Sequence, residues 1–378
     1  MNQETLNVRQ SSPLISVLMP VRNAEAFLPE ALQSLLSQTY ADFEILIIND
    51  GSTDGGMEWI AAVDDSRIRI LGDERQLGIA ARLNQGIEAA NGKYIARMDA
   101  DDLCAPDRLE RQVRRMETDP AIDVLGTAAA YIDERGEVVG APRPAPYDDR
   151  CIKWRMLTSN CIIHPSVMLR GSVVKEHRYS EDCAYAQDFD LWLRLAVKGF
   201  RFANLPEVLL LQRRHSTTVS VVRRKEQIEC AADSLVQYFK EKCSVELGLP
   251  AARGIINPPA DLSGDTAISS PVAIIEDLFS KTAETYSSLK DQEFRNFVRR
   301  DLYFFALRYF YRSLARGYSL LTNGDIAGAA RALVVAASGR FQTASILRES
   351  FLRRRHYVKE ARNILEAYSR EKVIVSRG

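Results

Sequence analysis

The sequence predicts an α/β fold with a mainly parallel sheet covered by helices on both faces, followed by an all-helical C-terminal region. Three observations carry this prediction. Short apolar runs alternate with stretches of helical periodicity over the first 130 residues. Turn residues such as Gly, Pro, Asn and Asp separate these segments. After Val219 the pattern changes, and helical periodicity dominates. Alternating strands and helices are typical of parallel sheets, whose connections cross over through a helix.

The elements can be placed in order along the chain. Strands are expected at Ile15–Met19, Glu44–Ile48, Ile68–Leu71 and Tyr94–Met98. Helices are expected between them and after them, at Ala24–Ser37, Met57–Val63, Ile79–Ala90 and from Pro106 to Met116. Further on, the pattern predicts a hairpin over Val124–Val139, a short helix at Ile152–Leu157, a strand at Ile162–Leu169, a helix at Phe189–Val197, and strand-like segments on either side of Pro206.

The composition is that of an ordinary globular protein, with 46% hydrophobic residues and a formal net charge of zero over 378 residues. This balance argues against a generally basic nucleic-acid binder and against an acidic disordered chain. Six scattered cysteines without a C-x-x-C pair indicate neither a zinc ribbon nor a disulfide scaffold, so reduced thiols are expected. The N-terminus has no signal-peptide pattern, and no apolar run approaches the roughly 20 residues of a membrane span. A cytoplasmic protein is expected.

Acidic clusters follow two of the predicted strands, Asp50-Gly51-Ser52-Thr53-Asp54 and Asp99-Ala100-Asp101-Asp102. In parallel sheets, ligands bind beyond the carboxyl ends of the strands. Residues two apart in a strand face the same way, so Asp99 and Asp101 are placed to converge on one cation. Hard divalent ions such as Mg²⁺ or Mn²⁺ prefer oxygen ligands of this kind. The alternative is a solvated acidic loop in which Asp102 or Asp107 caps the next helix.

Three common α/β enzyme classes are excluded by missing motifs. The turn after the first strand reads Pro20-Val21-Arg22-Asn23-Ala24, without the glycines of a dinucleotide fingerprint. No P-loop and no Gly-x-Ser-x-Gly nucleophile elbow occur either. A nucleotide held through a metal ion remains compatible with the acidic strand ends.

Six motifs in order resemble glycosyltransferase family 2 over roughly residues 14–220. They are Ile15–Asn23, Ile48–Asp54, Gly78–Asn84, Asp99–Asp102, Gln187-Asp188-Phe189-Asp190-Leu191-Trp192 and Arg213-Arg214-His215-Ser216-Thr217-Thr218-Val219-Ser220. The resemblance implies the Rossmann-like GT-A fold and an inverting, nucleotide-sugar-dependent transferase. It also implies Mn²⁺ or Mg²⁺ as cofactor.

The resemblance assigns donor-side roles residue by residue. Asp50 matches the aspartate that binds the nucleobase, and Pro20, Arg22 and Asn23 lie on the turn that contacts the base. Many family members carry an aromatic residue where Arg22 stands, although a guanidinium can also stack on a base. Asp99 matches a ribose- or metal-contacting position, and Asp101 matches the metal ligand.

The two later motifs supply the remaining roles. Asp188 matches the catalytic base, although the usual Glu-Asp pair reads Gln187-Asp188 here, and Asp190 is expected to lie within the helix. In the closing loop, His215 matches a metal- or diphosphate-contacting histidine, with a surface histidine as the alternative. Arg213 and Arg214 are expected to contact the diphosphate or to act as lid residues. On the acceptor side, His164 is an acceptor contact or a buried structural histidine, and Trp154 could stack on a sugar ring.

The resemblance divides the chain into a flexible N-terminus (1–13), a GT-A domain (14–220) and a helical C-terminal domain (221–378). The last part is basic: residues 295–378 contain 17 Lys and Arg against 6 Asp and Glu, a charge of +11 against −11 for the rest. An apolar stripe runs from Phe294 to Tyr309. It indicates internal packing, an anionic membrane surface or self-association. Ala315–Ser338 resembles one tetratricopeptide hairpin, and an ordinary helical hairpin is the simpler interpretation.

The sequence thus predicts a metal-dependent inverting transferase that moves a sugar from a nucleotide-sugar, taken to be a UDP-sugar, to a glycan or lipid-linked saccharide of surface polysaccharide synthesis. The alternatives are a GDP- or dTDP-sugar donor, a nucleotidyltransferase, or an idle transferase domain that serves as a helical scaffold. No nucleic-acid partner is expected, a homo-oligomer remains open, and the expected location is the cytoplasm or the inner face of the membrane.

Overall fold

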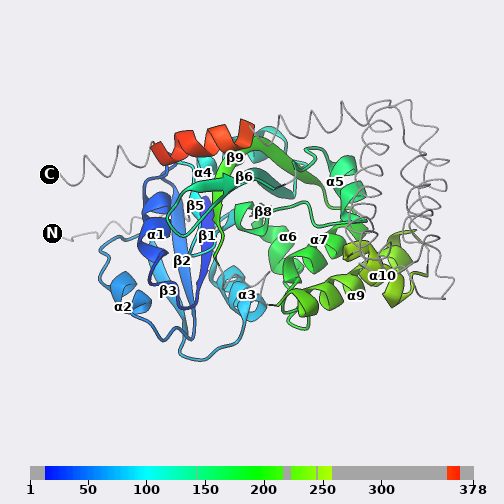
Figure 1. The fold of residues 1–378 in the computed structure, drawn as a ribbon. Helices are drawn as coiled ribbons and strands as arrows, with labels where there is room; N and C mark the ends of the chain where they lie inside the picture. Colours follow the sequence, from blue (N-terminus) through cyan, green and yellow to red (C-terminus); the bar gives the residue numbers. More distant parts are fainter. Residues whose placement is uncertain (1–12, 143, 216–222, 244–245, 258–355, 367–378) are drawn as a thin grey trace, which may run out of the picture.

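The computed structural model describes residues 13–142, 144–215, 223–243, 246–257 and 356–366 (Figure 1). Within these residues, nine strands form one sheet, in the order β3-β2-β1-β4-β8-β6-β9-β5, with β7 paired to β6. The α/β prediction is confirmed, and the sheet divides into two parts that differ in strand direction.

The first part is the parallel half that was expected from the N-terminal alternation. Its strands are β1 (Ile15–Val21), β2 (Phe43–Asp50), β3 (Ile68–Asp73) and β4 (Tyr94–Arg97), and its helices are α1 (Leu28–Leu36), α2 (Gly56–Ala61) and α3 (Ile79–Ala89). β1 pairs in parallel with both β2 and β4, and β2 with β3. The first helix begins four residues later than expected, because Pro29 occupies its first turn and residues 25–27 form a turn.

Alternate residues of the central strands feed two separate cores. Val17 and Met19 of β1 pack in the core that includes α1 and α4 (Arg108–Thr118), whereas Leu18 packs in the core that includes α3. Side chains of successive strand residues point to opposite faces, so helices cover both faces of the sheet. Near-continuous apolar runs in β1 and β2 follow from this double burial.

The second part of the sheet is mixed. Its elements are β5 (Leu103–Cys104), β6 (Val124–Ile132), β7 (Val138–Gly140), α5 (Asp149–Met156), the 3-10 helix η1 (His164–Ser166), β8 (Met168–Arg170), α6 (Gly171–Glu176), α7 (Gln187–Val197) and β9 (Phe202–Arg213). β8 runs antiparallel to both β4 and β6, and β5 antiparallel to β9, whereas β6 and β9 are parallel. The expected hairpin is confirmed by the antiparallel β6–β7 pair.

Two local predictions in this part are wrong in detail, and proline explains both. The expected strand at Ile162–Leu169 is instead η1 followed by the three residues of β8, because Pro165 fixes its own φ and lacks an N–H for a ladder. The segments on either side of Pro206 form one strand, β9, whose register to β6 shifts near Thr127 and Ala128. An irregularity of this kind is where a strand accommodates proline.

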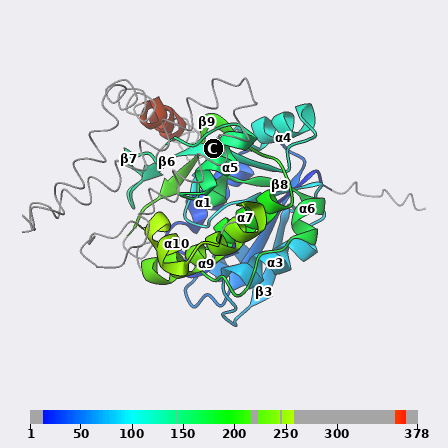
Figure 2. The ribbon, with the colours of Figure 1, turned by 90° about the vertical axis from the view of Figure 1, so that its right-hand side faces the viewer.

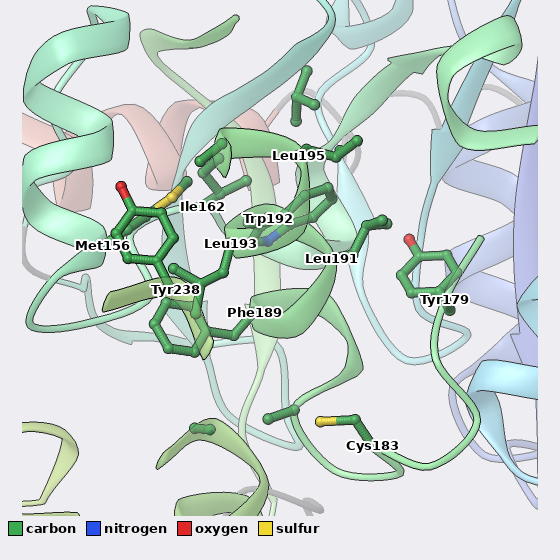
Figure 3. Close-up of a cluster of buried hydrophobic side chains, with 14 of the residues drawn as sticks. Met156, Ile162, Tyr179, Cys183, Phe189, Leu191, Trp192, Leu193, Leu195 and Tyr238 are labelled. Carbon is green, nitrogen blue, oxygen red and sulfur yellow. The ribbon is translucent and has the colours of Figure 1, made fainter. Parts of the chain in front are cut away.

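Two helices follow the sheet in the chain, α9 (Arg224–Cys243) and α10 (Leu249–Ile256). α9 packs against α7, and α10 packs against α9 (Figure 2). Tyr238 of α9 joins Phe189 and Trp192 of α7 in one buried cluster (Figure 3). The same packing brings Cys230 of α9 to Cys183, and the two are paired as a disulfide with Cα atoms 5.6 Å apart. The expectation of reduced thiols is wrong for this pair, since a separation of 47 residues gives no pairing signal.

A further helix at residues 356–366 returns to the opposite side of the sheet (Figure 1). Tyr357 and Ala361 are buried there with Leu103, Ala130 and Leu211. The N–H of Val208 donates to Glu360 Oε2 at 3.1 Å. The C-terminal helices that the structure describes therefore pack on the sheet and its helices, and a domain boundary at residue 220 stays a prediction.

Several predictions fall on residues that the structure does not describe. They include the N-terminal residues 1–12, the apolar stripe from Phe294 to Tyr309, the hairpin at Ala315–Ser338 and most of the basic segment after residue 295. Among the helices that are described, none is both long and apolar enough to cross a membrane.

Candidate active site

The carboxyl ends of β1, β2 and β4 meet at one edge of the sheet, because β1 pairs in parallel with the other two strands. The three ends lead into the turn at Pro20–Asn23, the turn at Asp50–Asp54 and the acidic segment Asp99–Asp102. The donor-side residues that the sequence predicts are thus brought to the edge where ligands bind in open α/β sheets.

Asp50 ends β2, and one of its carboxylate oxygens is already surrounded by donors. Oδ1 accepts from the N–H groups of Leu77 and Gly78 at 2.7 and 3.0 Å and from Arg82 Nε at 3.2 Å. Gly78 has a φ of +89°, a backbone conformation that favours glycine. For Oδ2 no hydrogen bond is found among the described residues. One oxygen is fixed by the protein, and the other is left for a ligand N–H.

The turn after β1 is locked to the turn after β2. Asn23, at φ +49°, accepts through its Oδ1 from the N–H of Thr53 at 2.8 Å. A second bond joins the same two turns: the N–H of Glu25 donates to Asp54 Oδ2 at 2.9 Å. Pro20 is half-buried and Arg22 is exposed beside this turn. Asn23 therefore shapes the turn that would flank a nucleobase, and Arg22 lies at its surface.

The carboxylates of Asp99, Asp101 and Asp102 each place one oxygen within 4.8 Å of the others. Burial raises the pKa of Asp102 well above its ordinary value, and the neighbouring charges of Asp101 and Asp99 add to this effect. Burial likewise raises the pKa of Asp99, against the opposing charge of Arg97. Asp102 Oδ1 accepts from the N–H of Arg213 at 2.8 Å, whereas Asp102 Oδ2 is buried without a partner among the described residues.

These residues fit a divalent cation. Crowded carboxylates repel one another, and a cation between them relieves both the repulsion and the orphaned oxygen of Asp102. Asp102 does not cap α4, whose N-cap residue is Asp107 and has no side-chain capping bond. The interpretation of the segment as a solvated acidic loop is therefore weakened by the burial of Asp102, which is 1% exposed.

His215 follows β9 and reaches the same cluster. Its Nε2 lies 2.9 Å from Asp101 Oδ2, and its ring stacks on Phe27 at a centroid distance of 5.7 Å. A neutral imidazole next to a carboxylate is a competent metal ligand. The structure thus brings together the three residues proposed from the sequence as metal ligands, Asp99, Asp101 and His215.

Arg213 does not fit the expected contact with a diphosphate. Its side chain is 1% exposed, and every nitrogen of its guanidinium donates to the protein. Nε donates to the carbonyl of Asp101 at 2.8 Å, Nη1 to the carbonyl of Asp133, and Nη2 to Glu30 Oε2 at 3.1 Å. Arg213 therefore ties the end of β9 to the acidic segment. Arg214 is half-buried, with its guanidinium 4.1 Å from the centroid of the Tyr131 ring.

Asp188 lies in the first turn of α7, and its Oδ2 accepts from Asn160 Nδ2 at 2.7 Å. Burial raises the pKa of this carboxyl, and hydrogen bonds and the charge of Arg97 oppose the shift. Its negative charge in turn raises the pKa of Asp99, so the two groups are close enough to interact. Asp190 is different: it pairs with Arg194 at 2.8 Å and accepts from Ser234 Oγ at 3.1 Å, as expected for a residue within the helix.

The two weaker acceptor predictions are resolved as core residues. His164 is 7% exposed, its Nε2 lies 2.8 Å from the hydroxyl of Tyr179, and its ring meets the edge of Trp192. Burial lowers the pKa of His164 well below its ordinary value, so it is a neutral structural histidine. Trp154 is 6% exposed in the core that includes α7, so its ring is not available to stack on a sugar.

Two residues near the site were not predicted from the sequence. Arg97 is 3% exposed at the end of β4 and binds Asp99 through both terminal nitrogens. The sequence did contain a signal for this pair. Arg97 stands inside an apolar run and two residues before the acidic cluster, and a buried charge needs a partner. Asn160 lies in a loop 28 residues before Asp188, and its sequence context gives no signal of their contact.

Comparisons with known proteins show what this chain resembles in sequence and in fold. The family model "Glycosyl transferase family 2" matches residues 16–178. The uncharacterized glycosyltransferase MJ1057 of Methanocaldococcus jannaschii is 33% identical over 61% of this chain and 81% of its own length. The O-antigen biosynthesis glycosyltransferase WbnJ of Escherichia coli is 32% identical over 61% of this chain and 90% of its own length.

The fold is shared with TarS of S. aureus, residues 1–349, whose structure was solved in complex with UDP-GlcNAc. The TM-score is 0.52 at 16% sequence identity, over 94% of this chain and 92% of that chain. This similarity supports the GT-A architecture of the sheet. Together with the family model and with relatives above 30% identity that are matched over most of their length, it leads to one conclusion: the chain is a glycosyltransferase and belongs to glycosyltransferase family 2.

Proposed function

We propose that this glycosyltransferase moves a sugar from a UDP-sugar to a hydroxyl of a glycan or lipid-linked saccharide, with inversion at the anomeric carbon and with a divalent cation. The observation that carries the proposal is the placement of Asp188. It lies at the start of α7, close enough to the acidic cluster to interact with Asp99, and is held by Asn160 rather than by a salt bridge. Separate acidic groups for the donor and for the acceptor are what an inverting transfer needs.

Asp50 is proposed to read the nucleobase. Its Oδ1 is fixed by three donors, which leaves Oδ2 as an acceptor at a defined position. An ionised carboxylate accepts hydrogen bonds only, so it favours a base that presents an imino N–H. Uracil, thymine and guanine present one, whereas cytosine and adenine present an acceptor nitrogen there. The proposal is therefore a UDP-sugar, with dTDP- and GDP-sugars as the alternatives within the same chemistry.

Asp101, Asp99 and His215 would hold Mn²⁺ or Mg²⁺, and the free oxygen of Asp102 lies in the same cluster. Such an ion, when bound, neutralises charge on the diphosphate of the donor. The residues of the chain contribute the rest. Arg213 secures the segment that carries Asp101 and Asp102, and Phe27 supports the ring of His215.

Asp188 is proposed as the general base. It would remove the proton of the acceptor hydroxyl as that oxygen attacks the anomeric carbon from the face opposite the leaving nucleoside diphosphate. The raised pKa of Asp188 suits this role, because a base whose pKa lies nearer the working pH accepts a proton more readily. Asn160 donates to Oδ2 and thereby orients the carboxylate.

The acceptor and the location extend the proposal. WbnJ is named for O-antigen biosynthesis, and by similarity we place this chain in the synthesis of a surface polysaccharide. Acceptors of this class are commonly lipid-linked, and the charge of +11 over residues 295–378 would favour an anionic membrane surface. Co-sedimentation with anionic and neutral vesicles tests this contact, and equal binding to both vesicle types at low salt would contradict it.

The test of the function compares Asp188→Asn with Asp190→Asn. Both replace one carboxylate of α7, but Asp190 pairs with Arg194 and Ser234, away from the proposed reaction. Loss of a general base typically costs about 10²–10⁴-fold in rate. Asp188→Asn should therefore lose transfer by about that factor while binding UDP as before. If Asp190→Asn loses transfer and Asp188→Asn does not, the assignment of the base is wrong.

The donor class is tested first with the unmodified protein. Donor hydrolysis across UDP-, dTDP-, GDP- and CDP-sugars, with Mn²⁺ and with a chelator, should show turnover only of donors whose base has an imino N–H, and only with metal. Turnover of none of them would favour the idle transferase domain instead.

A further inference from the structure

Arg97 is buried beside the proposed metal ligand Asp99, and the proposed function gives it no role. Its two terminal nitrogens take both oxygens of one carboxylate: Nη1 donates to Asp99 Oδ2 at 2.8 Å, and Nη2 pairs with Asp99 Oδ1. A two-point contact between a planar guanidinium and a carboxylate fixes the plane of the carboxylate as well as its position. Asp99 is thereby held in one orientation at the donor side.

The backbone of Arg97 is fixed as firmly as its side chain. Its N–H donates to the carbonyl of Val167 at 3.0 Å, and its own carbonyl accepts from Arg108 Nη2 at 2.7 Å. Arg108 is fully buried. The guanidinium of Arg97 therefore projects from a rigid point at the end of β4, and not from a mobile loop.

The positive charge of Arg97 lies beside the acidic segment. It opposes the raised pKa of both Asp99 and Asp102. His164 adds no positive charge here, because burial and Arg97 keep it neutral. In Arg213 every guanidinium nitrogen donates a hydrogen bond to the protein. In Arg97 the Nε is buried and has no hydrogen-bond partner among the described residues.

Resting on the function proposed above, we propose that Arg97 is a positioning residue for the donor side of the reaction. It holds the carboxylate of Asp99 in one plane, toward the donor nucleotide and its cation. This role does not require Arg97 to touch a substrate. The proposal therefore predicts a loss of nucleotide affinity that passes through Asp99.

A double-mutant cycle tests whether the effect passes through Asp99. The variants are Arg97→Met, Asp99→Asn and the double variant, with UDP affinity measured in Mn²⁺ and kcat measured at saturating donor. Each single variant should weaken UDP binding about tenfold, and the double variant no further, because both single changes remove the same contact. The kcat of the double variant should likewise equal that of Asp99→Asn.

Arg97→Lys separates the charge from the two-point contact. Lysine restores the charge but cannot bind both carboxylate oxygens in one plane. We therefore expect the UDP affinity of Arg97→Lys to stay reduced, close to that of Arg97→Met. Arg170→Met is the matched control, since Arg170 is half-buried and donates to the carbonyls of Ile122 and Pro120 outside the site. This variant should leave both measurements unchanged.

Three results would overturn the proposal. Additive losses of UDP affinity would show that Arg97 does not act through Asp99. A double variant with a kcat well below that of Asp99→Asn would show that Arg97 acts on the transfer by another route. Wild-type UDP affinity in Arg97→Lys would show that the charge alone is sufficient and that the two-point contact is not needed. Failure of the function itself is distinguishable: if Asp188→Asn transfers normally, the base is misassigned, and the UDP cycle still reports on the Arg97–Asp99 pair.

Discussion

The turn after β2 and the turn after β4 lie on either side of β1, and both contain aspartates. The protein supplies enough hydrogen-bond donors and positive charge for the aspartate after β2, but not for those after β4. Asp50 has one oxygen filled by two backbone N–H groups and by Arg82, which is 1% exposed. The segment after β4 has three carboxylates close together, with Asp102 Oδ2 buried and unpartnered. The same signal in the sequence thus produces a hydrogen-bond acceptor of fixed direction at one strand end and an excess of negative charge at the other.

The difference follows from the number of carboxylates that each buried arginine must balance. Arg82 pairs with Asp50 and also with Asp73, whose carboxylate is 42% exposed and is hydrated in part. Arg97 pairs with Asp99 and acts at longer range on Asp102 and Asp188. The first group is neutralised within the protein, whereas the second requires a positive charge from outside. Four experiments test this contrast.

The largest effect is expected at the acidic cluster. Asp101→Asn should lower the affinity for UDP in Mn²⁺ by about 100-fold or more, because a bound metal ion is worth several kcal/mol to a diphosphate. Addition of a chelator to this variant should then change little. Titration calorimetry of UDP with and without Mn²⁺ measures both. Asp107→Asn, at the N-cap of α4 and paired with Arg111, is the control. Wild-type affinity in Asp101→Asn would show that the cluster does not bind the metal.

The second effect concerns the turn after β2. Asp50→Asn can place its amide NH₂ where Asp50 Oδ2 stands, which replaces an acceptor by a donor. UDP affinity should fall about tenfold, and the preference for UDP over CDP should shrink, while the dependence on metal stays. Asp73→Asn is the matched control, because Asp73 also pairs with Arg82, whereas the N–H groups of Leu77 and Gly78 donate to Asp50. An unchanged UDP/CDP preference in Asp50→Asn would mean that Asp50 does not read the base.

The third effect is on stability and concerns pH. Asp99 and Asp102 have a pKa above the ordinary value in the folded protein, so their contribution to stability is fully present below the pKa of the unfolded chain. It is lost as the pH rises through the folded value. Without metal, ionisation of these carboxylates at neutral pH should therefore lower the melting temperature. Mn²⁺ should raise the melting temperature by about 2–4 °C at pH 7.5 and by less at pH 5.

Thermal melts in Mn²⁺ and in chelator at the two pH values measure this difference. Asp102→Asn should abolish most of the pH dependence of the metal effect, because it removes the most deeply buried carboxylate of the cluster. An equal shift at both pH values would contradict the view that the cluster has an uncompensated charge.

The smallest effect is expected where the two turns are locked together. Asn23→Ala removes the acceptor for the N–H of Thr53 and places alanine at positive φ. Both changes cost stability, about 1–2 kcal/mol in sum. Nucleotide affinity should fall less than threefold, because Asp50 is held by other contacts. Denaturant unfolding and UDP titration check the two parts, and a large loss of affinity would show that Asn23 itself binds the nucleotide.

The order of strands and helices was predictable because buried parallel strands are continuous apolar runs that end in turn residues. The direction of the later strands was not predictable. Strand β8 runs antiparallel to β4 and follows the 3-10 helix at His164–Ser166, and the sequence pattern there predicted a strand instead of this helix. The acidic residues were found because charge at strand ends is visible in the sequence. Their partners were not, because Arg213 reaches Asp102 across 111 residues.

His164 and Trp154 are residues that the sequence proposed for the acceptor site and that the structure places in the core. Both residue types occur in sugar-binding sites and in cores, and only packing distinguishes the two cases. His164 is enclosed by Tyr179 and Trp192, and Trp154 by the core that includes α7. Local sequence gives the chemistry of a side chain, whereas its accessibility depends on elements that lie far away in the chain.

The helix at residues 356–366 has a consequence for how this enzyme can be recombined with its relatives. α10 and the helix at residues 356–366 are both packed in buried clusters of the protein, so the chain is anchored before and after residues 258–355. In modular terms these residues are an internal segment of the sequence and not a C-terminal extension. A chimera should exchange the intervening residues and keep the returning helix. Cutting the chain after residue 257 would instead expose the apolar surface of Leu103, Ala130 and Leu211 to water.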